Sequence, residues 1–383
     1  MKILHVAESI RGGCGTYLNE TVPAQIAELG RENMRVLVPA QHASHLSRID
    51  PGCLRTFHRP RRSLGLFFMA AAAGTILKSF RPDVVHLHST FAGVVIRLMA
   101  PLLARRSFIV YCPHGWVFDV EMPAAPRRLL GRIERLLATL TGRIVAISHY
   151  EYEAGKKIGI DPGKLVEIVN GIRDLVSKRQ AVWNDKRLRV LFVGRMDVQK
   201  GFDVLVRAVY SLEDQVTVRA IGAAIHSAGK SAGNESAALQ NVEMLGWMGE
   251  EDIAAHMLAC DVIVIPSRWE GFGLVAIEAM RAGKAVVATS VGGLRSIVVD
   301  GITGRLIPKN DAQSLAMVLT SRSASDWAEM GQAGRTRYLE LYTVDRVHRE
   351  LMSLYRQTAP DLRRASAQRI ELERTAHEPS APE

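Results

Sequence analysis

The chain is poor in cysteine and in long apolar runs, and each shortage excludes a class of protein. The cysteines are Cys14, Cys53, Cys112 and Cys260, and no two form a CxxC pair, so neither a zinc knuckle nor a thioredoxin-like motif is present. So few cysteines in a chain of 383 residues suit a reducing cytoplasm. The most apolar stretch, Leu64–Leu77, is well short of the ~20 residues that span a bilayer, so we expect no transmembrane helix. Residues 1–10 read as a strand and lack a signal-peptide layout.

Aromatic residues are also scarce, at 6% of the chain, although the first half is strongly basic. Residues 1–180 hold 25 Lys and Arg against 14 Asp and Glu, a charge of +11, while the remainder carries −1. Such asymmetry indicates either an anionic partner, namely nucleic acid, anionic lipid or a phosphorylated substrate, or simply a solvated basic face. Nucleic-acid binding is the weakest of these, because the basic half lacks interleaved aromatic residues.

Short apolar runs, most of them followed by a helical pattern, dominate the rest of the chain. This alternation is typical of parallel sheets covered by helices on both faces. The predicted strands are Ile3–Ala7, Arg35–Val38, Val84–His88, Phe108–Cys112, Ile144–Ser148, Val190–Val193, Val216–Ile221, Val262–Pro266, Ala285–Ala288 and Gly304–Ile307.

The pattern stops and restarts around the polar residues 173–189, which predicts two doubly wound, Rossmann-like α/β domains facing each other across a cleft. We expect an N-terminal domain at 1–175, a linker at 176–189, a C-terminal domain at 190–342 and a helix at 343–358. The polar tail, 359–383, is predicted to be disordered.

Two loops of the first domain are candidate ligand contacts. Gly12 and Gly13 follow the first predicted strand, where glycines and a helix N-terminus let backbone N–H groups approach a phosphate or sugar. A structural tight turn explains this pattern about as well. His114, between Pro113 and Gly115 at a strand end, favours a ligand contact, whereas His86 and His88 read as structural.

A stronger group follows the strand Val190–Val193. Arg195 and Lys200 lie in one strand-end loop, where a forked guanidinium and a mobile ammonium suit a diphosphate. Two solvated cations in a surface loop are the alternative.

The most specific group follows the strand that ends at Pro266. Glu270 lies in a loop with Gly271, Phe272 and Gly273, and Glu278 lies eight positions on, in the predicted helix. The glycines permit close approach of a ligand, and the helix N-terminus offers free N–H donors to a leaving phosphate. A loop carboxylate can accept hydrogen bonds from sugar hydroxyls, and one on the helix can hold a ribose diol. No acidic cluster stands at a strand end to hold Mg²⁺.

Taken together, these residues resemble the GT-B glycosyltransferases of family 4, over nearly the whole chain. The motifs stand in family order: Gly12-Gly13, Pro113-His114-Gly115, Ala146-Ile147-Ser148, Asn170-Gly171, Gly194-Arg195 with Lys200-Gly201, Pro266-Ser267, Glu270 with Glu278, Gly292-Gly293 and Gly301-Ile302-Thr303-Gly304.

The resemblance implies a retaining, usually metal-independent enzyme without a cofactor. Donor-binding residues would be Gly12, Gly13, Arg195, Lys200, Gly271, Phe272, Gly273 and Glu278, with Arg195 and Lys200 on the diphosphate and Glu278 on the ribose. Glu270 and His114 would lie at the reacting sugar, His114 touching the sugar or acceptor, and the last helix would cross back onto the first domain.

This chain departs from the family at two places. Leu294-Arg295-Ser296-Ile297 stands where relatives commonly have a proline and a glutamate, which removes a carboxylate and adds a cation. Gln199 stands where an acidic residue is common.

We therefore expect a hexosyltransferase-type glycosyltransferase, cytoplasmic or peripheral on the inner face of the membrane. It would use a nucleotide diphosphate sugar and a glycan or polyprenyl-linked acceptor in surface polysaccharide biosynthesis, with an anionic membrane surface as a further partner. The alternatives are a non-catalytic nucleotide-sugar-binding or membrane-scaffold protein and a nucleotide-sugar epimerase. A phosphorylase is disfavoured, because nothing indicates a lysine-bound pyridoxal cofactor.

Overall fold

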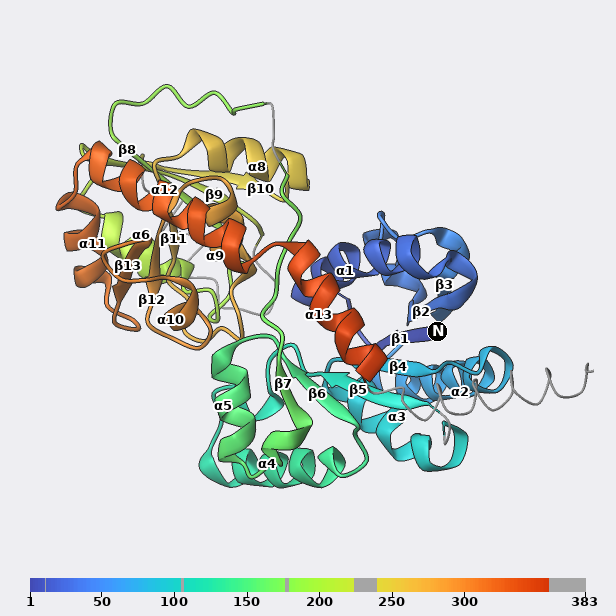
Figure 1. The fold of residues 1–383 in the computed structure, drawn as a ribbon. Coiled ribbons are helices and arrows are strands. Elements are labelled where there is room, and N and C mark those ends of the chain that lie inside the picture. The colour runs from blue at the N-terminus through green and yellow to red at the C-terminus, as the bar shows by residue number, and fades with distance from the viewer. Residues whose placement is uncertain (11, 105–106, 176–178, 224–239, 358–383) are drawn as a thin grey trace, which may run out of the picture.

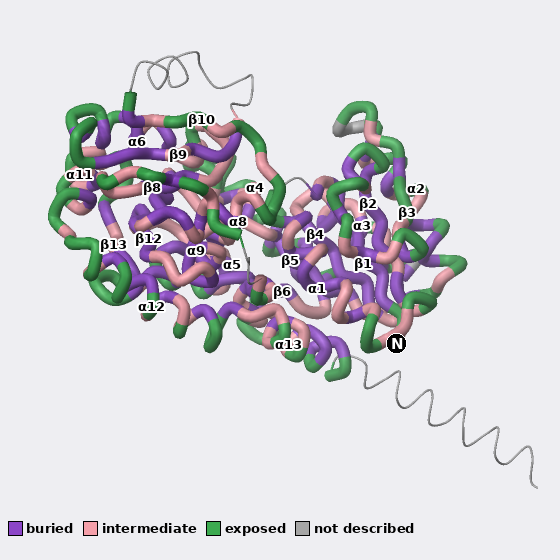
Figure 2. Tube along the Cα trace, turned by 90° about the horizontal axis from the view of Figure 1, so that it is seen from above, coloured by how far each residue is buried: buried purple, intermediate pink, exposed green. Residues whose placement is uncertain are grey.

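The first half of the chain forms one parallel sheet and the second half forms another (Figure 1). The computed structural model describes residues 1–357, apart from residues 11, 105–106, 176–178 and 224–239. The predicted tail, 359–383, lies outside the described residues. In each half the strands at the centre consist largely of buried residues, and exposed residues surround them (Figure 2). The prediction of two Rossmann-like α/β domains is confirmed.

The first sheet has the strand order β3-β2-β1-β4-β5-β6-β7. Its strands are β1 (Ile3–Ala7), β2 (Met34–Pro39), β3 (Leu54–Phe57), β4 (Val84–His88), β5 (Phe108–Cys112), β6 (Arg143–Ala146) and β7 (Leu165–Glu167). The order reverses between β1 and β4, and such a switch point opens a crevice at the carboxyl ends of the strands. The glycine loop after β1 lies at this crevice.

The second sheet has the order β10-β9-β8-β11-β12-β13. Its strands are β8 (Leu188–Val193), β9 (Val216–Ile221), β10 (Val242–Gly246), β11 (Val262–Ile265), β12 (Ala285–Thr289) and β13 (Gly304–Ile307). Its switch point lies between the neighbours β8 and β11. The loop that carries Arg195 and Lys200 follows β8, and the loop that carries Glu270 follows β11, so the topology brings the two loops together.

Helices cover both faces of the first sheet because its strands are apolar on both sides. Ile3 and Ala7 of β1 pack toward α1, whereas Leu4 and Val6 pack into the opposite core. That second core lies under α2–α5. Of the helices α1–α5, α1 therefore covers one face of the sheet and the other four cover the opposite face. The bounds are α1 (Gly13–Leu29), α2 (Arg62–Phe80), α3 (Thr90–Leu103), α4 (Ala124–Ala138) and α5 (His149–Lys157).

The second sheet is covered in the same manner. Helices α6 and α11 pack on one face, and α8 and α9 pack on the other, with α12 beside α9, β12 and β13. The bounds are α6 (Phe202–Val209), α8 (Glu250–Ala259), α9 (Leu274–Arg281), α10 (Leu294–Ile297), α11 (Ala312–Thr320) and α12 (Ala324–Leu341).

The chain returns to the first domain through α13 (Val344–Gln357), which packs against α1 (Figure 1). The return begins at a hinge where Ile172 donates its N–H to the Tyr342 carbonyl at 2.9 Å and accepts from the Val344 N–H at 3.0 Å. The Tyr355 hydroxyl then lies 2.6 Å from Nδ1 of His86, inside the first domain. One apolar core is continuous across both domains as a result.

The predicted strands are all present, and those that the sequence did not predict are β3, β7 and β10. Each of these lies at the edge of its sheet. An edge strand is partly exposed to water, so its sequence needs no continuous apolar run. Arg55 and Thr56 of β3 and Glu243 and Met244 of β10 are accordingly exposed.

The described part of the predicted linker packs along the second domain. The Ala181 N–H donates to the Ala255 carbonyl of α8 at 3.0 Å, and Trp183 is buried. Strand β8 begins at Leu188, inside the predicted linker.

Candidate active site

A cleft of about 1460 Å³ is lined by loops from both domains. Its walls are the segments that follow β1, β4, β5 and β6 of the first sheet and β8, β11, β12 and β13 of the second. The predicted catalytic and donor-binding residues all line this cleft, and these are Gly12, Gly13, His114, Arg195, Lys200, Glu270, Gly271, Phe272, Gly273 and Glu278.

The glycine pair opens helix α1 toward the cleft. Gly12 has φ +83°, a backbone conformation that side chains rarely adopt, and a Cβ built on it would meet no atom within 4 Å. No side chain caps the helix, which begins at Gly13. The N–H groups of Gly15 and Thr16 donate to the Gly12 carbonyl, so those of Gly13 and Cys14 are the donors that an anion could meet. A Cβ on Gly13 would lie 3.5 Å from Leu274 at the start of α9, so the two helix N-termini are neighbours across the cleft.

His114 belongs to the turn after β5 and has an unusual positive φ of 52°. Its Nε2 lies 2.9 Å from Nδ1 of His88, and its ring packs edge-on against Tyr17. Burial lowers the pKa of His114 to about 3. The ring is therefore neutral near pH 7 and presents no cation to a bound phosphate.

The loop after β8 carries the two predicted diphosphate ligands. Arg195 lies 3.1 Å from the Asp197 carboxylate and donates to Oε1 of Gln199 at 2.8 Å. Gln199, which stands where relatives commonly have an acid, thus positions the guanidinium. The ammonium of Lys200 lies 2.6 Å from Oε2 of Glu270, and both side chains are largely shielded from water. The pair leaves a cation and a carboxylate on the same wall of the cleft.

Glycines of the second domain hold the Glu270 loop in place. Gly292 has φ +48°, and a Cβ there would lie 1.7 Å from the Glu270 carbonyl oxygen. The next residue, Gly293, donates its N–H to that same carbonyl at 3.1 Å. Any side chain at Gly292 would therefore displace the backbone that carries Glu270.

Glu278 lies on α9, half-buried and at the cleft wall. Burial raises its pKa, and the nearby Arg281 opposes that effect. Phe272 is placed differently from a simple ligand contact. It is 4% exposed, and its ring packs against Tyr342 of the hinge. Phe272 therefore couples the loop that carries Glu270 to the segment that joins the domains.

Other residues also line the cleft, and no sequence motif had pointed to Asp119, Glu121, Tyr150 or Lys309. Asp119, in the 3-10 turn η4 (Val117–Asp119), has its pKa raised to about 6 by burial, and Tyr150 hydrogen bonds to it. An ion pair between Glu121 and Lys309 joins the two domains at the cleft. Arg295, the cation of the departure noted above, also lines the cleft and donates through Nε to the Ser290 carbonyl at 2.8 Å.

A second contact between the domains lies in the loop that carries Glu270. The Ser148 hydroxyl donates to the Gly271 carbonyl at 3.0 Å. A Cβ on Gly271 would lie 3.3 Å from a carboxylate oxygen of Glu151, a buried residue of α5. Burial raises the pKa of Glu151 to about 8.

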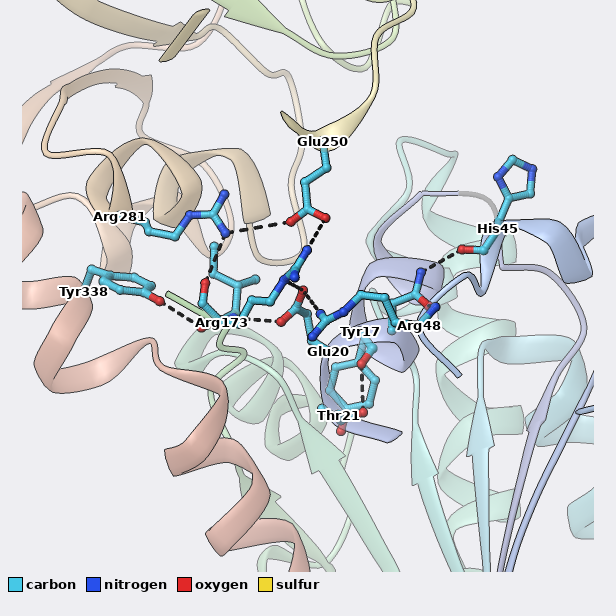
Figure 3. Close-up of polar contacts among 11 residues, drawn as sticks. Tyr17, Glu20, Thr21, His45, Arg48, Arg173, Glu250, Arg281 and Tyr338 are labelled. Atoms are coloured by element: carbon cyan, nitrogen blue, oxygen red, sulfur yellow. Dashed lines mark hydrogen bonds and ion pairs between the residues drawn. The ribbon is translucent and has the colours of Figure 1, made fainter. Parts of the chain in front are cut away.

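Arg173 joins the domains at the hinge itself. Figure 3 shows it between Glu20 of α1 and Glu250 of α8. Its guanidinium donates to Glu250 at 2.6 Å and lies 3.6 Å from Glu20, whose other oxygen accepts the Arg173 backbone N–H at 2.7 Å. Arg281 donates to the Arg173 carbonyl at 3.1 Å. This hinge network of Glu20, Arg173, Glu250 and Arg281 ties both domains to one backbone segment.

Two facing Rossmann-like domains, with paired cations and carboxylates in the cleft between them, define a class of enzymes that act on nucleotide-linked substrates. Comparison with known proteins supports the same class of enzyme. The family model described as Glycosyltransferase Family 4 matches residues 12–174, and the one described as Glycosyl transferases group 1 matches residues 175–333. The chain belongs to the GT-B glycosyltransferases of the family 4 type and is a glycosyltransferase.

Among curated relatives, an uncharacterised 41.2 kDa protein in the cps region of Klebsiella pneumoniae is 29% identical over 347 residues, which is 88% of this chain and 94% of that protein. A D-inositol 3-phosphate glycosyltransferase of Geodermatophilus obscurus is 28% identical, over 75% of this chain and 69% of that protein.

Solved structures share the fold. The Anabaena protein HepE in complex with UDP-glucose superimposes with a TM-score of 0.78 at 22% identity, over 93% of this chain and all of HepE. Sucrose-phosphate synthase from Thermosynechococcus elongatus gives a TM-score of 0.76 at 20% identity, over 93% and 99% of the two chains.

Proposed function

We propose that this glycosyltransferase moves a sugar, with retention of anomeric configuration, from a nucleotide diphosphate sugar to a glycan or lipid-linked acceptor in surface polysaccharide assembly. The observation that carries the proposal is the cleft wall where Arg195 and Lys200 stand beside Glu270 and Glu278. The UDP-glucose bound by HepE and the cps-region relative support the donor class and the polysaccharide role.

The first chemical task is to stabilise the departing nucleotide diphosphate. Arg195 and Lys200 supply fixed positive charge, and the N-termini of α1 and α9 supply backbone N–H donors. Lys200 is already held by Glu270, so the ammonium has little freedom to lose when a phosphate arrives. These groups neutralise the charge of the leaving group, as a bound metal cation does in other enzymes. We therefore propose that the reaction needs no divalent metal.

The second task is to hold the sugar where the bond to the phosphate breaks. Glu270 accepts hydrogen bonds from sugar hydroxyls beside the reacting carbon, and His114 meets the sugar from the first domain. Glu278 holds the ribose diol, away from the reacting carbon. Glu270 is not assigned as a covalent nucleophile.

We also propose that the acceptor reaches the first domain from an anionic membrane. Helix α4 exposes Leu129, Ile133 and Leu136 together with Arg128 and Arg132. Its neighbour α3 exposes Leu98 and Leu102, and α2, beside α3, exposes Leu64 and Phe67. The three helices lie on one side of the first domain (Figure 1). In the part of the chain that the structure describes, none of the helices has the length and apolarity to cross a bilayer.

The test is incubation of the purified protein with a panel of nucleotide diphosphate sugars, beginning with UDP-glucose, and measurement of released nucleotide by chromatography. We expect slow hydrolysis with one donor, lost in Lys200→Ala, and a transferred sugar whose anomeric configuration by NMR matches the donor. Folded protein that binds a donor but releases no nucleotide from any of the panel would favour the scaffold alternative. A sugar epimerised while still attached to its nucleotide would favour the epimerase.

A further inference from the structure

A group of histidines lies buried in the first domain behind the cleft. His5 of β1 stands opposite His86 of β4 in the parallel register, and His88 is two residues further along the same face. Helices α1 and α13 cover this face, and all three side chains have no exposed surface. A fourth histidine, His114, lies at the edge of the group and lines the cleft. The group therefore extends from the core of the domain to the donor site.

Hydrogen bonds join three of these rings into a chain that starts at Gln25 of α1. Oε1 of Gln25 lies 2.8 Å from Nε2 of His5. Nδ1 of His5 lies 2.9 Å from Nε2 of His88, and Nδ1 of His88 lies 2.9 Å from Nε2 of His114. Among the rings of His5, His88 and His114, Nδ1 of His114 is the one nitrogen that takes no part in these contacts. His86 stays outside this chain, because its Nδ1 meets Tyr355.

Each ring of the chain carries a single proton. Burial lowers the pKa of His5 to about 4 and that of His114 to about 3, and it lowers the pKa of His88 well below its usual range. All three imidazoles are therefore neutral near pH 7. A neutral imidazole donates from one nitrogen and accepts at the other.

The carbonyl end of Gln25 sets the direction of the whole chain. An amide oxygen only accepts, so the proton of His5 must be on Nε2. Nδ1 of His5 is then bare and accepts from Nε2 of His88. By the same step Nδ1 of His88 is bare and accepts from Nε2 of His114. The proton of His114 is consequently on Nε2, and its Nδ1 is a bare acceptor.

We propose that Gln25, acting through His5 and His88, fixes His114 in the tautomer whose Nδ1 accepts a hydrogen bond, so that the first domain selects a hydroxyl group on the bound sugar. Gln25, His5 and His88 are positioning residues, because none of them needs to touch the substrate. The substrate part of this inference rests on the proposed function, whereas the tautomer itself is a property of the free protein.

The arrangement gives the donor site a preference that a freely rotating imidazole lacks. A substrate hydroxyl that donates to Nδ1 satisfies both partners. A sugar that presents only an acceptor at that place leaves two lone pairs facing each other, and buried polar groups left unpaired are what discriminate strongly between substrates.

NMR of the purified protein with ¹⁵N-labelled histidine tests the inference without substrate, because protonated and bare ring nitrogens resonate far apart. In the wild type we expect His114 to be neutral and protonated on Nε2. In Gln25→Leu the acceptor is gone, so we expect a mixture that includes the Nδ1-protonated form of His114. The matched control, His86→Leu, removes a buried histidine outside the chain and should leave the His114 tautomer unchanged.

The kinetic counterpart is the ratio kcat/KM for the donor sugar, which we expect to fall about three- to tenfold in Gln25→Leu and to stay near the wild-type value in His86→Leu. Wild-type His114 protonated on Nδ1 would overturn the proposal even if Gln25→Leu does not fold. An unchanged tautomer in folded Gln25→Leu, or equal changes in both variants, would overturn it as well. If the purified protein had no transferase activity, the proposed function would be refuted, but the tautomer result would still stand.

Discussion

The ammonium of Lys200 and the carboxylate of Glu270, 70 residues apart in the sequence, lie 2.6 Å from each other in the cleft. The pair unites the two strongest sequence motifs in one site. Under the proposed function, a diphosphate that binds Lys200 would compete with Glu270 for the ammonium.

Substitutions of Glu270 and Glu278 should have different effects on kcat and KM. A ribose contact is equally strong in the ground state and the transition state, whereas a contact beside the reacting carbon matters more in the transition state. Glu278→Ala should raise the donor KM roughly ten- to a hundredfold, the loss of one charged hydrogen bond. Glu270→Ala should lower kcat by at least as much. Glu329→Ala, an exposed carboxylate of α12 away from the cleft, is the control. Effects of both cleft variants on KM alone would remove Glu270 from any chemical role.

The sequence was sufficient to place Lys200 and Glu270 each at a strand end, but not to place them together. Their contact depends on β8 and β11 being neighbours, which is a property of sheet topology that no local periodicity encodes. The same limit applies to His5 and His88, which read as separate strand residues until the register of β1 against β4 is known. The local signals were strong where a chain segment is buried on both faces and weak at the edge strands β3, β7 and β10.

Contacts across the hinge carried no sequence signal at all. Arg173 lies in a polar stretch that reads as a linker, and only the fold shows that Glu20 and Glu250 flank it. Phe272 lines the cleft, and its ring also packs against Tyr342, a contact that carried no sequence signal. A motif predicts which loop meets the ligand, whereas tertiary packing decides where each side chain of that loop points.

Activity should persist after exhaustive chelation. The residues that neutralise the diphosphate would be Arg195 and Lys200, together with two helix N-termini, and these do not depend on a divalent ion. The measurement is donor hydrolysis in excess EDTA, followed by dialysis and assay. Loss of activity that only Mg²⁺ or Mn²⁺ restores would contradict the proposal.

Glu151 should make the protein less stable as the pH rises. Its pKa is raised from 4.5 to about 8 by burial, so between these values the folded state holds a proton that the unfolded state has lost. The free energy of unfolding therefore falls as the pH rises through this window, by up to a few kcal/mol. Glu151→Gln removes this dependence and keeps the oxygen that accepts the Ile147 N–H.

Urea unfolding from pH 5 to pH 8.5 checks this prediction. The curves of the wild type and Glu151→Gln should coincide near pH 5, and the variant should be the more stable protein at pH 8. Buried His5 and His114, whose pKa values are lowered, weaken both proteins alike below about pH 6.5 and cancel in the difference. Glu153→Gln, an exposed position of the same helix, is the control and should shift little. A constant difference across the range would show that Glu151 does not titrate in the folded state.

Arg173→Met should loosen the two domains. The variant removes the guanidinium between Glu20 and Glu250, while Glu20 keeps Arg48 at 2.8 Å. We expect the radius of gyration of the unliganded protein, measured by small-angle X-ray scattering, to increase and to return toward the wild-type value with saturating nucleotide. Arg179→Met removes an exposed ion pair with Asp252 of the same helix α8, outside the hinge network, so this variant should leave the radius unchanged. Equal radii in all three proteins would show that the hinge network does not hold the domains together.

The exposed face of α4 favours binding to a membrane. If the helix merely covered the sheet, its leucines and isoleucine would be buried. Instead, Leu129 is 58% exposed and Leu136 is 69% exposed, whereas Leu137 is buried on the inward face with Gly131, Glu134 and Ala138. The buried Glu134 is paired with Arg97 of α3 at 2.8 Å, so the inward face of α4 is held by an ion pair. Apolar and basic side chains are thus left together on the outside, a pattern suited to a membrane interface.

Vesicle co-sedimentation decides whether this surface docks on a membrane. Each basic residue near an anionic surface contributes ~1 kcal/mol, so Arg127, Arg128, Arg132 and Arg135 together suffice for reversible attachment. Binding should require anionic lipid, weaken as salt rises and fall when these four arginines are changed to serine. Leu129→Ser with Leu136→Ser should weaken binding at every salt concentration, because it removes the apolar contact and leaves the charge. A variant with Lys186 and Arg207 of the second domain changed to serine controls for lost positive charge and should bind like the wild type. Equal binding to neutral vesicles, or no binding to either kind, would show that α4 faces water rather than lipid.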